Sequence, residues 1–415
     1  MIISVENLKV WGNEMSIAWD DKEWTVKYPP SIDLQFVPQE LLWVMFGMVT
    51  SEEWAWKSSI DVHLPEELKS TILDWWMGML VINHKANPYG LNEYDEYGFT
   101  FTNGSHKPWE FPSPEGKIYP TIVMNGMGKD ALCQIGMLTE LSPNEKILAV
   151  TVDHPWEFSD KTTYTHLLNR LWELENNIGI PTALVQTNAN EVFNMHIIPW
   201  YIYALPFMYL HQTNTCYHAM ELEFNKYLNG VPIKPNTSVP VLLSINKLLK
   251  SLGYDMEYRS GTVPLSSYDA QKLLVERYPE LQKLQTSCHH GFPNCNTCPK
   301  CQCHMAYLKV MGKNLKEYRY NGKIKKGFSV EKLLDIERES QHWALGRTSG
   351  QNVSDFDAMV SGYWKDALPY GIPHSESIIK EHFEPWIGSL QTYGKYAYNT
   401  EDWDKTAQEI CNGTI

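Results

Sequence analysis

The sequence predicts an α/β protein with a parallel sheet, an α+β region before the sheet and a four-cysteine module after it. From Tyr119 onward, short apolar runs alternate with amphipathic segments, and a glycine-rich loop follows the first run. Strands that alternate with helices favour parallel pairing through right-handed crossovers. A third observation predicts the module, because five of the eight cysteines lie between residues 287 and 304.

The first 118 residues are expected to form an N-terminal α+β domain. Three short runs within residues 1–34, "ISVENLKVWG", "EMSIAWD" and "EWTVKYP", are separated by polar turns and predict strands. Residues 65–80 predict a helix, because Pro65 suits a first helical position and apolar residues recur every four positions. Residues 91–118 are rich in glycine, proline and asparagine, and predict a loop or linker.

Residues 119–287 are expected to form the sheet and its helices. Each predicted strand is a short apolar run, as in strands that are buried on both faces. Helices are predicted from Ala131 and over 164–179, where Gly179 favours a helix end. The predicted strands are "TIVMN" (121–125), "KILAVTVD" (146–153), "TALVQT" (182–187) and "TCYHAMEL" (215–222).

Composition excludes several classes of protein. The 415 residues are 43% hydrophobic and 20% charged, which is ordinary for a globular chain of two or three domains. No apolar run is long enough for a membrane span, and the N-terminus lacks a secretion signal, so we expect a cytoplasmic protein. A net charge of −14 argues against broad nucleic-acid binding. Nothing in the sequence indicates an oligomeric state.

The cysteine cluster predicts a structural metal site. Cys288, Cys295, Cys298 and Cys301 follow the spacing C-x6-C-x2-C-x2-C. Clustered cysteines in a reducing compartment are typical of metal ligands, and four thiolates complete a tetrahedral zinc site with no open position. An iron–sulfur cluster is the main alternative. We expect the neighbouring Cys303, His289, His290 and His304 to lie outside the site, and the isolated Cys133, Cys216 and Cys411 to be buried packing residues.

The loop after the first core strand, "NGMGKDA" (125–131), predicts a phosphate site. Gly126 and Gly128 would let the backbone approach a ligand, and amides at a helix start would face an anion. Lys129 would add positive charge, and Asp130 would hold magnesium or position the loop. The glycine spacing fits neither a Rossmann fingerprint nor a Walker A loop, so an ordinary glycine turn is an equally good interpretation.

The glycine loop and the cysteines together resemble the PP-loop ATP-pyrophosphatase superfamily. The superfamily motif is S-G-G-x-D-S, of which Gly128 and Asp130 match the second glycine and the aspartate. The cysteine pattern is similar to that of 7-cyano-7-deazaguanine synthases, which carry a structural zinc. This resemblance implies a Rossmann-like, HUP-type nucleotide-binding core.

A second family resembles more of the chain, about residues 35 to 315. The ATP-dependent UDP-N-acetylmuramoyl-L-alanyl-L-glutamate epimerases carry G-G-G-K-D-S, similar to Gly126, Gly128, Lys129 and Asp130, and a C-x2-C-P-K-C motif, similar to "CNTCPKC". Their N-G-H-V-P segment resembles residues 194–199 here. Two departures concern the loop: Met127 stands where the family has glycine, and Ala131 lacks the hydroxyl of the last serine.

The resemblance implies attack by a substrate carboxylate on the α-phosphate of ATP, with release of pyrophosphate. Gly126, Gly128, Lys129 and Asp130 would bind the phosphates with a magnesium ion, and Asp153, at the end of the second strand, would orient the nucleotide. Epimerisation of a glutamyl-type α-carbon would also need a general base. His196 and Glu221 are the candidates. Each of these residues also has a purely structural interpretation. His196 would be a buried histidine, Glu221 a surface glutamate and Asp153 a turn residue.

Two other functions stay open. One is a ligase of the deazaguanine-synthase type, which would form an amide or nitrile with ammonia in nucleotide modification. The other is a non-catalytic, zinc-stabilised scaffold with a degenerate loop, which Met127 and Ala131 favour. We expect a zinc module over residues 288–315 and a C-terminal extension over 316–415, whose role the sequence does not indicate.

Overall fold

The protein is described by a computed structural model. It describes residues 2–4, 8–19, 22–54, 59–65, 72, 75–76, 79, 98–104, 119–141, 143–153, 161–192, 199–220, 227–228, 231–232, 239–262, 267–288 and 294–324. The expected C-terminal extension therefore lies outside the described residues from position 325 onward. His196, Glu221, His289, His290 and Cys411 also lie outside them.

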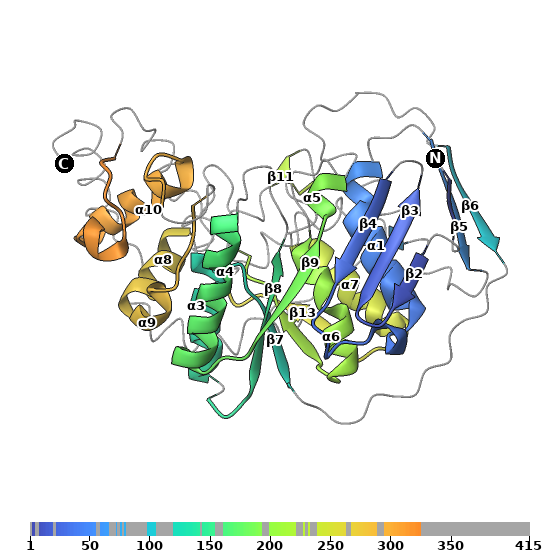
Figure 1. Cartoon of the computed structure of the whole chain (residues 1–415), viewed down its shortest axis with the longest axis horizontal. Coiled ribbons are helices and arrows are strands. Elements are labelled where there is room, and N and C mark those ends of the chain that lie inside the picture. The colour runs from blue at the N-terminus through green and yellow to red at the C-terminus, as the bar shows by residue number, and fades with distance from the viewer. Residues whose placement is uncertain are drawn as a thin grey trace, which may run out of the picture.

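Among the described residues, eight strands form one sheet in the order β13-β10-β7-β8-β9-β4-β3-β2 (Figure 1). The first five strands in this order are parallel, which confirms the predicted α/β core. In chain order the five run 3-2-1-4-5, the order of a doubly wound sheet. They are β7 (Thr121–Met124), β8 (Ile147–Asp153), β9 (Thr182–Thr187), β10 (Thr215–Tyr217) and β13 (Glu257–Arg259).

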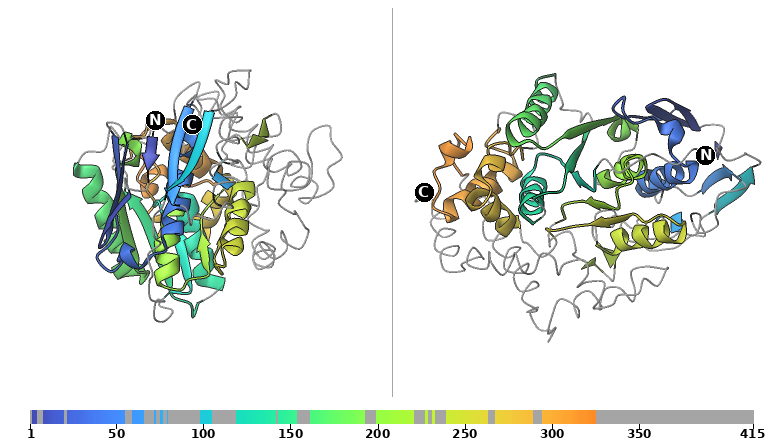
Figure 2. Two further views of the ribbon diagram at one scale, coloured as in Figure 1. Left: turned by 90° about the vertical axis from the view of Figure 1, so that its right-hand side faces the viewer. Right: turned by 90° about the horizontal axis from the view of Figure 1, so that it is seen from below.

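Helices cover both faces of this sheet (Figures 1 and 2). One face carries α3 (Lys129–Leu141), α4 (Lys161–Glu173), α8 (Ser267–Glu276) and α9 (Pro279–Gln282). The other carries α1 (Gln39–Trp54), η4 (Trp200–Ala204), α6 (Leu205–Leu210) and α7 (Val239–Ser251). All four residues of β7 are buried, which is why this strand reads as an unbroken apolar run.

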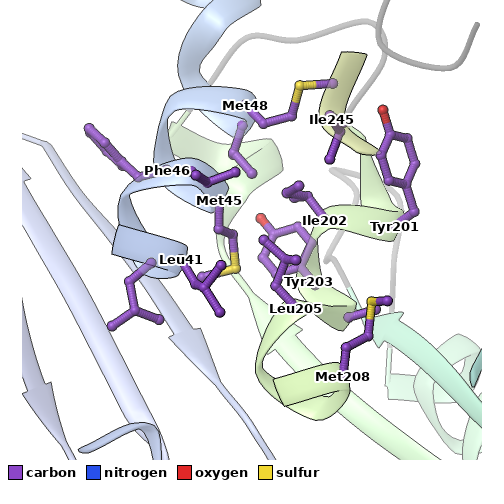
Figure 3. Close-up of a cluster of buried hydrophobic side chains, with 14 of the residues drawn as sticks. Leu41, Met45, Phe46, Met48, Tyr201, Ile202, Tyr203, Leu205, Met208 and Ile245 are labelled. Carbon is purple, nitrogen blue, oxygen red and sulfur yellow. The ribbon is translucent and has the colours of Figure 1, made fainter. Parts of the chain in front are cut away.

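The larger half of the core lies between the sheet and α1, η4, α6 and α7. Figure 3 shows Met45 of α1 pointing toward Tyr203 of η4, and Met48 of α1 near Ile245 of α7. The hydroxyl of Tyr28 donates to the carbonyl of Tyr203 at 3.0 Å, so this buried polar group is satisfied.

The N-terminal strands continue the core sheet. β2 (Leu8–Trp11), β3 (Glu14–Trp19) and β4 (Lys22–Lys27) form an antiparallel meander, and β4 pairs antiparallel with β9. The sheet therefore crosses the boundary that the sequence places at 118/119. Trp24 sits at this junction, fully buried, with its indole N–H donating to Thr187 Oγ1 at 3.0 Å.

A second sheet of three parallel strands combines β1 (Ile2–Ser4), β5 (Ser59–Pro65) and β6 (Gly98–Gly104). Two local predictions change here. Pro65 ends β5 instead of starting a helix, although Ile72, Trp75, Trp76 and Met79 are helical and buried. The predicted loop 91–118 contains β6, because parallel pairing with β5 overrides its glycine-rich composition.

Shorter elements complete the fold. The helix predicted over 164–179 ends as expected at Gly179, whose φ of 82° is the left-handed conformation of a glycine cap. No described helix is both long enough and apolar enough to cross a lipid bilayer. The remaining elements are η2 (Leu34–Phe36), η3 (Leu174–Ile178), α5 (Ala189–Val192), β11 (Tyr227–Leu228), β12 (Val231–Pro232), α10 (Pro299–Val310) and η7 (Leu315–Tyr318).

Candidate functional site

The strand order reverses between β7 and β10. The chain winds outward from β7 in one direction through β8 and β9, and in the other through β10 and β13. In open α/β sheets, ligands bind where the strand order reverses, outside the carboxyl ends of the strands. The predicted glycine loop follows β7 directly and leads into α3, so it lies at this point.

Asn125 fixes the start of the loop. Its backbone N–H donates to the Val150 carbonyl at 2.7 Å, and its carbonyl accepts from Thr151 Oγ1, also at 2.7 Å. Its side-chain oxygen accepts from the N–H of Met127 at 2.9 Å, which makes an Asx turn. The loop is therefore tied to the end of β8 before it reaches the glycines.

Met127 turns its side chain into the core. It is 1% exposed and belongs to the hydrophobic cluster beneath α3, α8 and α9. Its φ is 54°, the left-handed region that costs a residue with a Cβ about 1–2 kcal/mol. Glycine adopts this conformation most readily, so Met127 keeps a backbone that its Cβ disfavours. The bulky side chain does not occupy the open side of the loop.

Gly126 and Gly128 border open space. A Cβ built on either glycine meets no atom within 4 Å, among the residues described. The first helical bond of α3 runs from the Leu132 N–H to the Gly128 carbonyl at 3.1 Å, so the amides before Leu132 belong to the first turn, where helices lack internal acceptors. A side chain at position 128 would enter the space in which a ligand could approach these amides.

Lys129 and Asp130 form an ion pair at the mouth of the loop. The Lys129 amine lies 2.5 Å from Asp130 Oδ1, and the two side chains are 6% and 25% exposed. A buried lysine needs a counter-charge, which the neighbouring carboxylate supplies. The two opposite charges therefore lie together at the start of α3.

Asp153 ends β8 at the same edge of the sheet. It is half-buried and lies opposite Gln186 of β9. Burial raises the pKa of its carboxyl group, and a hydrogen bond from Gln186 partly offsets this. Asp153 thus lies one strand away from the glycine loop, as the strand assignment predicted.

His218 is a site residue that the sequence did not single out. It follows β10 directly, its N–H donates to the Arg259 carbonyl at 2.8 Å, and its ring lies 4.8 Å from the ring of Tyr201. Parallel pairing of Tyr217 with Val123 brings His218 level with the end of β7, beside the loop. Burial lowers its pKa to about 4, so the ring is neutral at pH 7. The signal in the sequence was a histidine within the predicted strand 215–222.

Replacing His218 with asparagine should flatten the acid dependence of stability. In the unfolded chain the pKa of His218 has its ordinary value of 6.5. Between pH 6.5 and 4 the unfolded chain therefore binds a proton that the folded protein does not bind. From pH 7 to pH 5 the wild type should lose about 2 kcal/mol more unfolding free energy than His218→Asn. Urea unfolding at both pH values measures this. Equal losses in the two proteins would contradict it.

The four predicted cysteines come together. The Sγ atoms of Cys288, Cys295, Cys298 and Cys301 all lie within 4.8 Å of one another. The pairs 288/298 and 295/301 are each 3.9 Å apart. A tetrahedral ion with metal–sulfur distances of about 2.3 Å places sulfurs about 3.8 Å apart. The cluster therefore could hold a metal such as zinc.

Backbone N–H groups support these sulfurs. Cys298 caps the start of α10, and its Sγ accepts from the Cys301 N–H at 3.4 Å. Cys295 Sγ accepts from the N–H groups of Thr297 and Cys298 at 3.4 and 3.2 Å. Burial raises the pKa of the Cys295 thiol, but these hydrogen bonds outweigh it and lower the pKa to about 6, whereas burial raises the pKa of Cys301. The hydrogen bonds to Cys295 Sγ therefore favour a thiolate, the form in which cysteine binds a metal.

The other candidates near the cluster have different surroundings. His304 Nδ1 lies 2.9 Å from Gln285 Nε2 and 3.3 Å from the Tyr320 hydroxyl, which places this ring in a hydrogen-bond network beside the cluster. Cys303 is half-buried and is not part of the four-sulfur group. Cys133 and Cys216 are fully buried on opposite faces of the sheet, which confirms their packing role.

Comparison with family models and with curated proteins does not assign this chain to a family. Neither a family model nor any curated protein matches this sequence. The chemistry of the site therefore rests on the geometry of its residues: a glycine loop with open space at a switch point, a lysine–aspartate pair, and a neutral histidine on the adjacent strand.

Proposed function

We propose that the protein is an ATP-dependent enzyme of the HUP type that adenylates a substrate carboxylate and releases pyrophosphate. The observation that carries this proposal is the glycine loop at the carboxyl end of β7, with open space at Gly126 and Gly128 and with α3 beginning at Lys129. Strand, glycine turn and helix start place backbone amides around one anion site, which suits phosphates. The resemblance to PP-loop ATP pyrophosphatases adds the reaction type.

Each residue has a role in this reaction. Amides of residues 126 and 128 to 131 bind the phosphates, while the Met127 N–H stays bonded to Asn125 Oδ1. Lys129 neutralises charge that develops on the phosphates, and Asp153 orients the nucleoside. Asp130 would hold magnesium, which shields the phosphates from the incoming carboxylate when it is bound. The carboxylate oxygen bonds to the α-phosphorus as the bond to the β-phosphate bridging oxygen breaks, and both electrons leave with pyrophosphate. No proton transfer is needed in this step.

The four-cysteine site is assigned to zinc in a structural role. Four thiolates at tetrahedral spacing fill the coordination shell and leave no position for a substrate. Tyr320, Met305 and Leu308 belong to the same buried cluster as the cysteines. A closed, partly apolar shell stabilises the fold rather than performing chemistry.

Calorimetry with ATP and magnesium tests the nucleotide site. We expect the wild type to bind, Gly128→Val to lose binding because its side chain enters the open space, and Asp130→Ala to bind about tenfold more weakly or worse. Glu140→Ala, at the other end of α3 and exposed, removes a carboxylate far from the loop and should bind like the wild type. Circular dichroism checks that each variant is folded.

Product analysis then separates the candidate reactions. Pyrophosphate release with an amino-acid-bearing carboxylate and without ammonia supports the epimerase, for which His196, outside the described residues, remains the predicted base and Glu221 the predicted metal or acid–base residue. An ammonia requirement supports the ligase of nucleotide modification. A folded wild type that binds no ATP supports the zinc-stabilised scaffold and contradicts the proposed activity.

A further inference from the structure

The chain just before the cysteine cluster contacts the glycine loop. The backbone N–H of Thr286 donates to the carbonyl of Met127 at 2.7 Å. Thr286 is two positions before Cys288, the first cysteine of the cluster. Both partners lie in irregular segments, so this hydrogen bond is not part of a helix or a strand ladder.

Side-chain packing joins the same two segments. Met127 lies in one buried cluster with Leu281 and Leu284, which precede Thr286. A residue with a Cβ keeps a left-handed backbone only where its surroundings over-determine it. Residues 281–286 therefore support Met127 twice, through an apolar contact surface and through a backbone hydrogen bond.

Gln285 connects this segment to the module. Its side-chain amide exchanges two hydrogen bonds with Gln271 of α8, at 3.0 and 2.8 Å. Its Nε2 also lies 2.9 Å from Nδ1 of His304, three residues after Cys301 on α10. Residues 285–288 thus link the glycine loop, α8 and the cysteine cluster through successive positions of the chain.

We propose that metal binding at the four cysteines sets the conformation of the glycine loop, with Thr286 and Met127 as positioning residues. The metal fixes Cys288, which holds Thr286 against the Met127 carbonyl and keeps the loop open toward the ligand. Because coupling is reciprocal, nucleotide binding also strengthens metal retention. The nucleotide half of this inference rests on the proposed function; the effect of the metal on the loop does not.

Hydrogen exchange tests the link without any nucleotide. The full-length protein is compared with zinc bound and after removal of zinc by a chelator. We expect amide exchange of the segment covering residues 121–132 to rise at least about fivefold on metal removal, because the loop loses its support. Helix α7, on the opposite face of the sheet, should be unchanged. Unchanged exchange in 121–132 would overturn the proposal.

Two substitutions at one position isolate the backbone bond. Thr286→Pro removes the N–H, whereas Thr286→Ala keeps it and removes only the hydroxyl and methyl groups of the side chain; neither changes a cysteine. With zinc bound, Thr286→Pro should bind ATP about tenfold more weakly than Thr286→Ala, and metal-depleted wild type should weaken by a similar factor. MgATP should slow zinc release to a chromophoric chelator correspondingly.

The outcomes separate this inference from the proposed function. ATP binding that is the same with and without zinc, or the same in both folded Thr286 variants, overturns the coupling and leaves the nucleotide site intact. If the wild type binds no ATP, the proposed function fails, and the exchange experiment alone decides whether the metal positions the loop. If Thr286→Pro does not fold, the wild-type comparison of zinc-bound and zinc-depleted protein gives the decision.

Discussion

Replacing Cys298 with serine should abolish metal binding and unfold the cysteine module. Cys298 lies at the centre of the module, where its Sγ faces Cys288 at 3.9 Å and its residue caps α10. A structural zinc contributes on the order of 10 kcal/mol to the folding of its module, so the loss of one ligand should leave residues 294–324 without their main source of stability. Elemental analysis measures the metal, and hydrogen exchange measures the unfolding.

Cys303→Ser is the matched control for this experiment. Cys303 lies on the same helix, two residues beyond Cys301, but outside the four-sulfur group. The control should retain one zinc per chain and a protected α10. Zinc at full stoichiometry in Cys298→Ser, or wild-type protein that carries neither zinc nor iron, would contradict the assignment.

Trp24→Ala should destabilise the whole protein by about 3–5 kcal/mol, the usual cost of removing a buried tryptophan. The Trp24 ring is fully buried, 5.7 Å from the Phe46 ring and 6.2 Å from that of Tyr203. Because β4 pairs with β9, the parallel core should lose stability together with the N-terminal strands. Denaturant unfolding followed by fluorescence and circular dichroism should show one transition, shifted to lower denaturant.

Trp11→Ala provides the comparison for Trp24. Trp11 ends β2, an edge strand of the same sheet, and is 46% exposed, so its loss should cost less than about 1 kcal/mol. If Trp24→Ala instead produced a separate early transition and left the core transition in place, the N-terminal strands would form an independent unit, as the sequence alone had predicted.

The parallel strands were predictable because strands that are buried on both faces appear in the sequence as short apolar runs. All of β7 and the first five residues of β8 are buried, since helices cover both faces, whereas β9 alternates between more and less buried residues. The antiparallel addition was not predictable in the same way. The pattern of residues 8–27 shows strands, but not that Val26 pairs with Thr187, because partner choice depends on packing far along the chain.

The candidate site was likewise predictable only in part. Cysteine spacing has a direct geometric meaning, so the sequence identified all four members of the cluster. The glycine loop was identified by its position after a strand, but the direction of the Met127 side chain depends on the backbone φ and on Leu281 and Leu284, which the local sequence does not reveal. His218 was missed because its place beside the loop depends on which strand neighbours β7.

The pairing of β4 with β9 also orders events during synthesis. Trp24 and its partner Thr187 are 163 positions apart, so β4 leaves the ribosome well before its neighbour exists. At roughly 5–20 residues per second, the wait is on the order of 10–30 s. During that time Met15, Ile17, Trp24 and Val26, all buried in the finished fold, lack the β9 side of the sheet, although α1 follows soon after β4. Until β9 is made, β4 has an unpaired edge beside apolar side chains, the features that make a nascent chain prone to aggregate.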